Sequence, residues 1–201
     1  MPKCKLFTPK PGLHKKIVGA LVTRFDIPGK RGSQLVQKHL PKDLLSWAKL
    51  RILNGGDVIQ AASIKGIASD TRDRTFVRYQ TFIDKNSRKK KKAPEFQLET
   101  FYGRLIHIFS ISFDTPSSIA DLRLDSPTKV ILAVIKPCII SSTNNRLDIH
   151  YYSEQGSEIV LDLKCIQCVV GRVPIPPGGF KADWAIVDRS GSLARALEVD
   201  D

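Results

Sequence analysis

The first part of the chain carries apolar side chains at the spacing of an amphipathic helix. Leu13, Ile17, Leu21 and Phe25 recur every four residues and define one stripe. Positions at this interval fall on one face, because an α-helix turns once in about 3.6 residues. The sequence therefore predicts a first helix that packs this stripe against another element.

Two more helical segments are predicted before residue 50. The stretch DIPGKRG ends the first helix, and Ser33 is a candidate N-cap for a second helix that runs to His39. Pro41 suits a first helical turn, and the apolar residues after it supply another helical face. Residues 1–49 are accordingly predicted to form a helical N-terminal segment.

Beyond residue 50 the pattern takes the shorter period of β-strands. A turn is predicted at Gly55, Gly56 and Asp57, and residues 74–84 are rich in β-branched and aromatic side chains. The strongest predicted strand is 99–113. Further strands are predicted at 128–140, 146–152, 157–170 and 183–190, and a short closing helix at 192–199.

Strand 99–113 has apolar side chains on both faces, which is typical of a central strand or a barrel wall. Ile106 and Ile108 share one face. The other face is predicted to meet the main core with Phe101, Leu105, Phe109 and Phe113. Gly103 predicts a bend or a bulge within the strand.

Short strands that alternate with turn-forming sequence favour a small antiparallel barrel or sandwich. We therefore expect an α+β protein whose N-terminal helices precede a mostly antiparallel β-barrel-like domain. This domain is expected over residues 50–190, with a basic loop at 85–94. Residues 191–201 are expected to form a C-terminal tail or short helix.

The charge of the chain is unevenly distributed. Of the 201 residues, 42% are hydrophobic and 26% are charged, as in ordinary globular proteins. Residues 1–100 hold 22 Lys and Arg against 8 Asp and Glu, whereas residues 101–201 hold 10 against 12. A basic half joined to a nearly neutral half indicates a polyanionic partner, with nucleic acid ahead of a merely cationic surface.

Five consecutive cations, Arg88 to Lys92, lie between two predicted strands. A solvated loop tip, a nuclear-import signal and a phosphate clamp all account for such a run. Nearby aromatic side chains could stack on bases, but at strand spacing they belong more often to the core. The predicted phosphate-contacting residues, which would bind duplex DNA without sequence preference, are Arg72, Arg74, Arg78, Lys85, Arg88, Lys89, Lys90, Lys91 and Lys92.

The four cysteines predict reduced thiols inside the cell rather than a disulfide framework. Cys165 and Cys168 have the spacing of a metal pair, yet residues three apart on a strand face opposite sides. No second close pair accompanies them, since Cys138 and His150 are isolated. Two buried strand cysteines without a metal are therefore predicted.

No constellation of side chains in the sequence indicates a reaction. The four histidines are scattered, and none belongs to a triad-like or H-E-x-x-H pattern. Asp57, Asp70, Asp73 and Asp84 are candidate metal ligands for phosphoryl transfer. Each lies beside turn-forming or basic residues, where carboxylates commonly cap turns and pair with Arg. Structural roles are favoured, and no catalytic residue and no cofactor is predicted.

Six stretches of the chain together resemble one protein family. They are, in order, LRILNGGDVIQAAS, RDRTFVRYQTFIDKN, FQLETFYGRLIHIF, NRLDIHYYS, CIQCVVGRV and DWAIVDRSGSLARAL. They resemble the C-terminal region of Plavaka-type (CACTA-like) transposase-like proteins of mushroom-forming fungi, over residues 40–197. The resemblance implies a nuclease-like core upstream of this region and names no catalytic residue within it. The chain is therefore expected to be a truncated copy, a fragment or a domesticated remnant.

A second likeness concerns the fold. GGDVIQAA followed by TFYGRLIHIF is similar to the opening of bromo-adjacent homology domains, which are SH3-like barrels that bind chromatin or proteins. The later aromatic signature of those domains has no clear counterpart in this chain. The likeness therefore implies the barrel more than any ligand.

These expectations combine into a non-catalytic nuclear module that binds DNA or chromatin, or helps to assemble a transposon-derived complex. The main alternative is a protein–protein interaction module whose basic loop serves only for nuclear import. A divalent-metal nuclease that uses some of the four aspartates is a more distant alternative. No membrane partner is expected, because no apolar run has the roughly 18–20 residues that a span requires.

Overall fold

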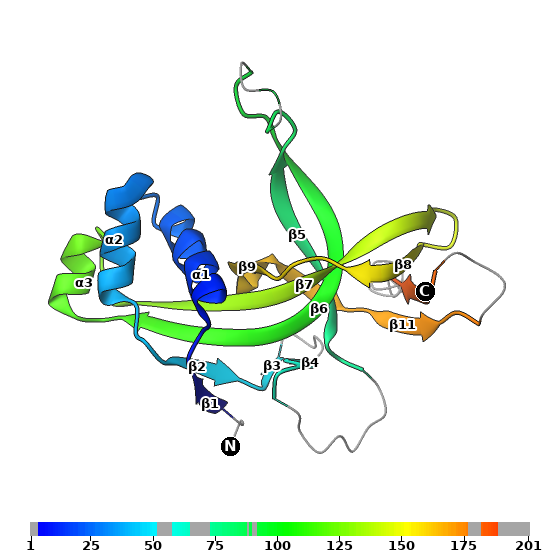
Figure 1. The fold of residues 1–201 in the computed structure, drawn as a ribbon, viewed down its shortest axis with the longest axis horizontal. Helices are drawn as coiled ribbons and strands as arrows, with labels where there is room; N and C mark the ends of the chain where they lie inside the picture. The colour runs from blue at the N-terminus through cyan, green and yellow to red at the C-terminus, as the bar shows by residue number, and fades with distance from the viewer. Residues whose placement is uncertain are drawn as a thin grey trace, which may run out of the picture.

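The computed structural model describes residues 4–51, 58–64, 73–87, 89, 92–176 and 182–188. Within these residues the protein is built around a large antiparallel sheet with three α-helices on one side of the molecule (Figure 1). The strands are β1 (Cys4–Phe7), β2 (Leu44–Trp47), β3 (Lys49–Arg51), β4 (Val58–Gln60), β5 (Phe76–Asp84), β6 (Phe96–Phe113), β7 (Thr128–Asn144), β8 (Ile149–Gln155), β9 (Ile159–Asp162), β10 (Ile166–Val169), β11 (Gly171–Pro174) and β12 (Trp184–Val187). None of the helices in this part of the chain is both long and apolar enough to cross a lipid bilayer.

The first predicted helix is confirmed as α1 (Pro11–Arg24). Pro11 begins it, where the missing backbone N–H would have no helical partner in any case. Ile17, Val18 and Leu21 are its buried side chains, as the apolar stripe requires. The sequence period therefore identified both the helix and its inner face.

The second helix, α2 (Gly29–His39), ends where predicted but begins earlier. Gly29 has a φ of +89°, which glycine adopts without strain, and this lets the chain turn directly from Pro28 into the helix. Ser33 lies inside the helix, where its hydroxyl donates to the carbonyl of Gly29. The prediction of Ser33 as the N-cap is therefore wrong.

The third predicted helix is also wrong, because the chain after Pro41 forms the strands β2 and β3. Leu44 and Ser46 point inward and are buried, which is the alternation of a strand. β2 pairs with β1 on one edge and with β6 on the other. Pairing on both edges provides hydrogen-bond partners for the backbone of β2, and this tertiary context overrides the local helical pattern.

The strands form an open sheet in the order β1–β2–β6–β7–β8–β12–β11. β5 also pairs with β6, β10 with β5, and β9 with β7, while β3 and β4 form a separate hairpin. All of these pairs are antiparallel. The predicted antiparallel sheet and α1–α2 are confirmed; closure into a barrel is not, since the sheet is open among the described strands.

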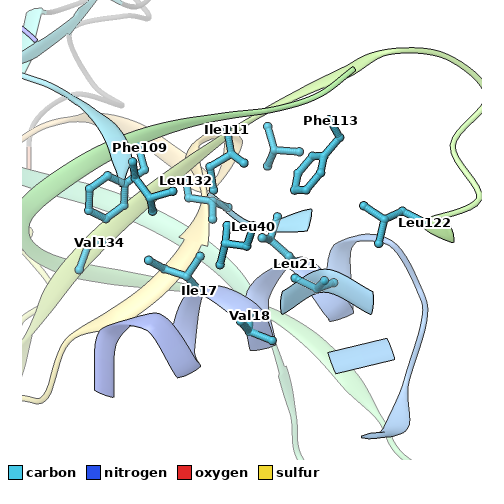
Figure 2. Packing of buried hydrophobic residues seen from close by; sticks show 13 residues of the cluster. Ile17, Val18, Leu21, Leu40, Phe109, Ile111, Phe113, Leu122, Leu132 and Val134 are labelled. Atoms are coloured by element: carbon cyan, nitrogen blue, oxygen red, sulfur yellow. The ribbon is translucent and has the colours of Figure 1, made fainter. Parts of the chain in front are cut away.

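The helices cover one face of β6 and β7 and enclose the largest hydrophobic cluster. Figure 2 shows Ile17 and Leu21 of α1 directed toward Phe109 and Phe113 of β6 and Leu132 of β7. The cluster is completed by Val18, Val36, Leu40, Leu44, Ile111, Leu122, Val130 and Val134. Burial of this face is what stabilises the helices, which have little reason to form alone.

A β-bulge divides β6 into two halves, and odd-numbered side chains point to opposite faces of the sheet in the two halves. The pairing with β7 shifts between Leu105 and His107, so Ile106 is an extra residue. Phe109 therefore faces the helices, whereas Leu105 packs in a second cluster on the opposite face of the sheet. Phe109 and Phe113 face the main core as predicted. The predicted single core face is wrong before the bulge, where Phe101 and Leu105 belong to the second cluster. Gly103 is not the bulged residue, since it pairs in register with Val77 and β7.

The stretch 157–170 is interrupted rather than one strand. β9 pairs with β7, a 3₁₀ turn follows at Leu163–Cys165, and β10 then pairs with β5. Asp162 caps this turn by accepting from the backbone N–H of Lys164 over 2.9 Å. The chain thus crosses from one part of the sheet to another, which a continuous apolar pattern does not predict.

One short helix had no counterpart in the sequence interpretation. α3 (Pro116–Asp121) connects β6 to β7 and begins at Thr115, whose hydroxyl accepts from the backbone N–H of Ser118. Threonine followed by proline is a helix start signal, so this element could have been predicted.

Candidate nucleic-acid interface

Two strands leave the body of the sheet as a projecting ribbon. β6 pairs with β7 only from Gly103 onward, and β10 reaches β5 no further than Tyr79. Residues 80–84 and 96–100 therefore pair only with each other among the described strands. With the connecting loop they form what we call the β5–β6 arm, which stands clear of the rest of the molecule (Figure 1).

The arm exposes a row of large apolar side chains. Phe82 pairs with Leu98, and Phe96 lies two pairs further out on the same face. Phe82 and Phe96 are each 65% exposed and Leu98 is 49% exposed. The expectation that nearby aromatic residues belong to the core holds for Phe76, Tyr79 and Tyr102, which are buried, but is wrong for these two.

Side-chain hydrogen bonds hold the outer end of the arm in shape. Asp84 accepts from the backbone N–H groups of Asn86 and Glu95, over 2.8 and 2.9 Å. Asn86 donates from its side-chain amide to the carbonyl of Ala93 over 2.9 Å. Asp84 is thus a turn cap, as the structural reading of that carboxylate predicts.

Three of the predicted phosphate-contacting residues lie in the described part of this loop. Lys85, Lys89 and Lys92 are all exposed, beside the apolar row of the arm. The other loop cations, Arg88, Lys90 and Lys91, lie outside the described residues, as does Arg72. The structure therefore brings the described loop cations together at the end of a projecting element.

Arg78 and Arg74 lie elsewhere. Arg78 is at the base of the arm, six residues from Asp84, and donates from Nη1 to Oδ2 of Asp188 over 3.0 Å. Arg74 precedes β5 and is half-buried and engaged in other interactions. Neither guanidinium belongs to the group at the outer end, so the predicted set of nine does not form one surface in the described residues.

The base of the arm is braced by a polar network that sequence reasoning missed. Tyr102 donates its hydroxyl to Oδ2 of Asp188 over 3.0 Å and contacts Nε2 of His150 over 2.8 Å. Burial, then the nearby Asp188 carboxylate, raises the pKa of Tyr102 well above its usual range. The phenol therefore joins β6 to the end of β12 and braces the base of the arm.

A cavity of about 430 Å³ adjoins this network, where β6 separates from β7. Thr100, Tyr102, Cys138 and His150 contribute to its wall. Burial raises the pKa of the Cys138 thiol to about 11, which keeps it protonated and unreactive. This thiol is therefore not activated as a nucleophile.

The two candidate metal ligands that the structure describes, Asp73 and Asp84, lie apart. Asp73 accepts from the backbone and hydroxyl of Thr75 and pairs with Arg172, at the end of β5 opposite to Asp84. Asp57 and Asp70 lie outside the described residues. Within the described ranges, no three His, Cys, Asp or Glu side chains form a group that could hold a metal ion.

The two candidate metal-binding cysteines differ from the prediction of two buried strand residues in two respects: Cys165 does not lie in a strand, and neither side chain is fully buried. Cys165 lies in the 3₁₀ turn and Cys168 in β10, and both are half-buried rather than buried. Burial raises the pKa of the Cys165 thiol, which opposes the thiolate form that zinc requires.

Comparisons with known proteins identify no relative of this chain. No protein-family model, curated protein or solved structure matches the chain significantly.

Proposed function

We propose that the protein is a non-catalytic DNA-binding module that contacts duplex DNA through the β5–β6 arm. The observation that carries the proposal is the projecting two-stranded ribbon with exposed lysines at its end and exposed phenylalanines beside them. A two-stranded ribbon fits the major groove of duplex DNA, and lysines at its end are suited to the phosphates. The contacts would be independent of base sequence, because phosphates carry no sequence information.

The energetics of the arm also favour a partner. An isolated two-stranded ribbon is marginally stable in water, and this one also exposes Phe82, Phe96 and Leu98 to solvent. Like charges in the loop repel one another, and a polyanion removes that repulsion. A second copy of the chain would instead bring two basic loops together.

The resemblance to the C-terminal region of Plavaka-type transposase-like proteins agrees with a DNA partner and a nuclear location. Both remain part of the proposal, as does the SH3-like barrel implied by the likeness to bromo-adjacent homology domains. The exposed Phe82 and Leu98 favour one second candidate, a protein–protein interaction module whose basic loop serves only for import. A metal-dependent nuclease has no comparable support in the described residues.

The experiment is a salt titration of binding to random-sequence duplex DNA. If about five phosphates are contacted, log K should fall with log[salt] at a slope of about −4 to −5. Replacing Arg88 and Lys89–Lys92 by Gln should flatten this slope by about three units or more and weaken every sequence alike.

The matched control removes the same charge from the body of the protein. It replaces five exposed lysines by Gln: Lys10, Lys15, Lys30, Lys42 and Lys49. The control should keep most of the wild-type slope, and melting curves of both variants should match the wild type. Absence of wild-type binding at low salt, or equal slopes in the two variants, would refute the arm as a DNA-binding element and leave the protein-partner candidate.

A further inference from the structure

A polar pocket at the opposite end of β5 from the basic loop gathers cations from three strands. Its volume is about 310 Å³. Arg104 of β6, Lys136 of β7 and Arg172 of β11 line it, together with the ring of Trp184 from β12. In the sequence these residues are far apart, and nothing in the local patterns links them.

Arg172 is held in one orientation by its surroundings. Its guanidinium carbon lies 4.2 Å from the centre of the Phe76 ring and 3.7 Å from that of Trp184. Nη2 forms an ion pair with Asp73 over 3.2 Å, and Nη1 lies 3.4 Å from the hydroxyl of Tyr152. A guanidinium fixed between two rings loses little further freedom when it binds a ligand.

The other two cations have unused hydrogen-bonding capacity. Arg104 lies against the same Phe76 ring, at 5.9 Å, and donates from Nε to the hydroxyl of Thr75 over 3.2 Å. Its terminal N–H groups have no acceptor within the described part of the chain. The ammonium group of Lys136 likewise has neither a carboxylate nor another acceptor among the described residues.

The register of the sheet places Arg104 and Lys136 directly opposite each other on β6 and β7. Like charges at directly opposed positions of an antiparallel pair destabilise it. An anion bound between these side chains would remove the repulsion and satisfy their free N–H groups at once. The pocket therefore holds uncompensated positive charge that a bound anion can neutralise.

We propose that this pocket binds the phosphate group of a small phosphate monoester. Arg104, Lys136 and Arg172 together with Asp73 carry a formal charge of +2. A phosphate monoester carries a charge of about −1.5 to −2 at neutral pH, which matches it, whereas a carboxylate leaves it half compensated. A pocket of about 310 Å³ lies at the lower end of the range for small-molecule sites. The proposal does not rest on DNA binding by the arm.

The test is a calorimetric and ³¹P NMR titration with ribose 5-phosphate, with ribose and acetate as uncharged and singly charged comparisons. We expect saturable 1:1 binding of ribose 5-phosphate with a Kd of about 1 mM or below. Ribose should not bind, and acetate should bind about tenfold more weakly or not at all. Inorganic phosphate shows whether the phosphate alone suffices, and should retain most of the affinity.

Variants of β7 separate a built site from general attraction to a basic protein. Lys136→Gln should weaken ribose 5-phosphate binding about tenfold, and Lys136→Arg should largely restore it. Lys129→Gln, which removes an exposed lysine of the same strand, should leave the affinity unchanged. Since Lys136→Gln removes a like-charged neighbour of Arg104, its melting temperature should be equal to or above that of the wild type.

Several results would overturn the proposal. They are the absence of saturable phosphate binding up to about 10 mM, equal effects of Lys136→Gln and Lys129→Gln, or acetate binding as tight as phosphate. Replacement of the five loop cations by Gln should not change phosphate affinity, and Lys136→Gln should not change the salt slope of DNA binding. Failure of one proposal is thereby distinguished from failure of the other.

Discussion

Arg78 and Asp188 form an ion pair that fastens the base of the β5–β6 arm to the end of β12, with Nη1 3.0 Å from Oδ2. The Asp188 side chain is almost fully buried and also accepts from Tyr102, while that of Arg78 is a quarter exposed. This pair explains why Arg78 is not part of the basic group at the outer end of the arm. It also means that the base of the arm depends on a residue 110 positions away in the sequence.

Asp188→Asn should destabilise the protein by about 2–3 kcal/mol, because it leaves a partly buried guanidinium without its counter-charge. The measurement is the free energy of unfolding in urea. Asp183→Asn, at an exposed position five residues earlier, should cost no more than about 0.5 kcal/mol. An equal, small effect of both substitutions would contradict a stabilising role for the pair.

Phe109→Ala should cost about 3–5 kcal/mol, because the side chain is fully buried between the sheet and α1 and its loss leaves a cavity. Denaturant unfolding measures this loss. Ser112→Ala, at an exposed position of the same strand, serves as control. A loss below about 1 kcal/mol would show that Phe109 is not part of the core.

Gly103→Ala should be strongly destabilising because β6 approaches β7 closely at this point. An added Cβ would lie 2.6 Å from Cγ2 of Ile135 and 2.8 Å from the carbonyl oxygen of Lys136. Relief of such overlap costs about 1–3 kcal/mol or more. Gly156→Ala should be nearly neutral, since its nearest neighbour would be at 3.9 Å. Similar melting temperatures for both variants would refute the close approach.

His107 should make the protein less stable in mild acid. The ring lies between Phe7 and Phe109, with centroids 4.4 and 5.1 Å away, and burial lowers its pKa below the usual 6.5. Below that pH the imidazole binds a proton more readily in the unfolded chain than in the folded protein. The contribution of neutral His107 to the free energy of unfolding is therefore fully present above about pH 6.5 and is lost on acidification.

His107→Phe should therefore reduce the loss of unfolding free energy between about pH 7.5 and pH 5.5. The quantity to compare is this difference in the variant and in the wild type, since carboxylates contribute equally to both. Glu158 and Lys5 influence the same ring in opposite directions, and their effects are smaller than that of burial. An unchanged difference would contradict the buried neutral histidine.

Phe82→Ser combined with Phe96→Ser should weaken DNA binding about tenfold without changing its salt slope, because apolar contacts release no counterions. Val173→Ser, at an exposed apolar position of β11, should leave the affinity unchanged. Binding assays at several salt concentrations give both quantities. If the affinity of the variant, extrapolated to high salt, equals that of the wild type, the aromatic row makes no contact with DNA.

The amino-acid sequence by itself determined the elements whose pattern is local and strong. α1 follows from an apolar stripe at helical spacing, and β5, β6, β7 and β12 follow from runs of β-branched and aromatic residues. The sequence also identified the basic run as a feature of a loop between two strands. These properties need no long-range contact, because backbone preference and side-chain period already specify them.

Only the tertiary structure decided the facing and grouping of side chains. The bulge at Ile106 reverses the alternation of β6. Residues Leu44–Trp47 have a helical pattern in the sequence, yet they form β2 because they pair with β1 and β6. Phe82 and Phe96 are exposed because no element covers the arm, although Phe76 and Tyr79 on the same hairpin are buried. Arg104, Lys136 and Arg172 meet in one pocket because strand register, and not sequence spacing, sets which distant side chains become neighbours.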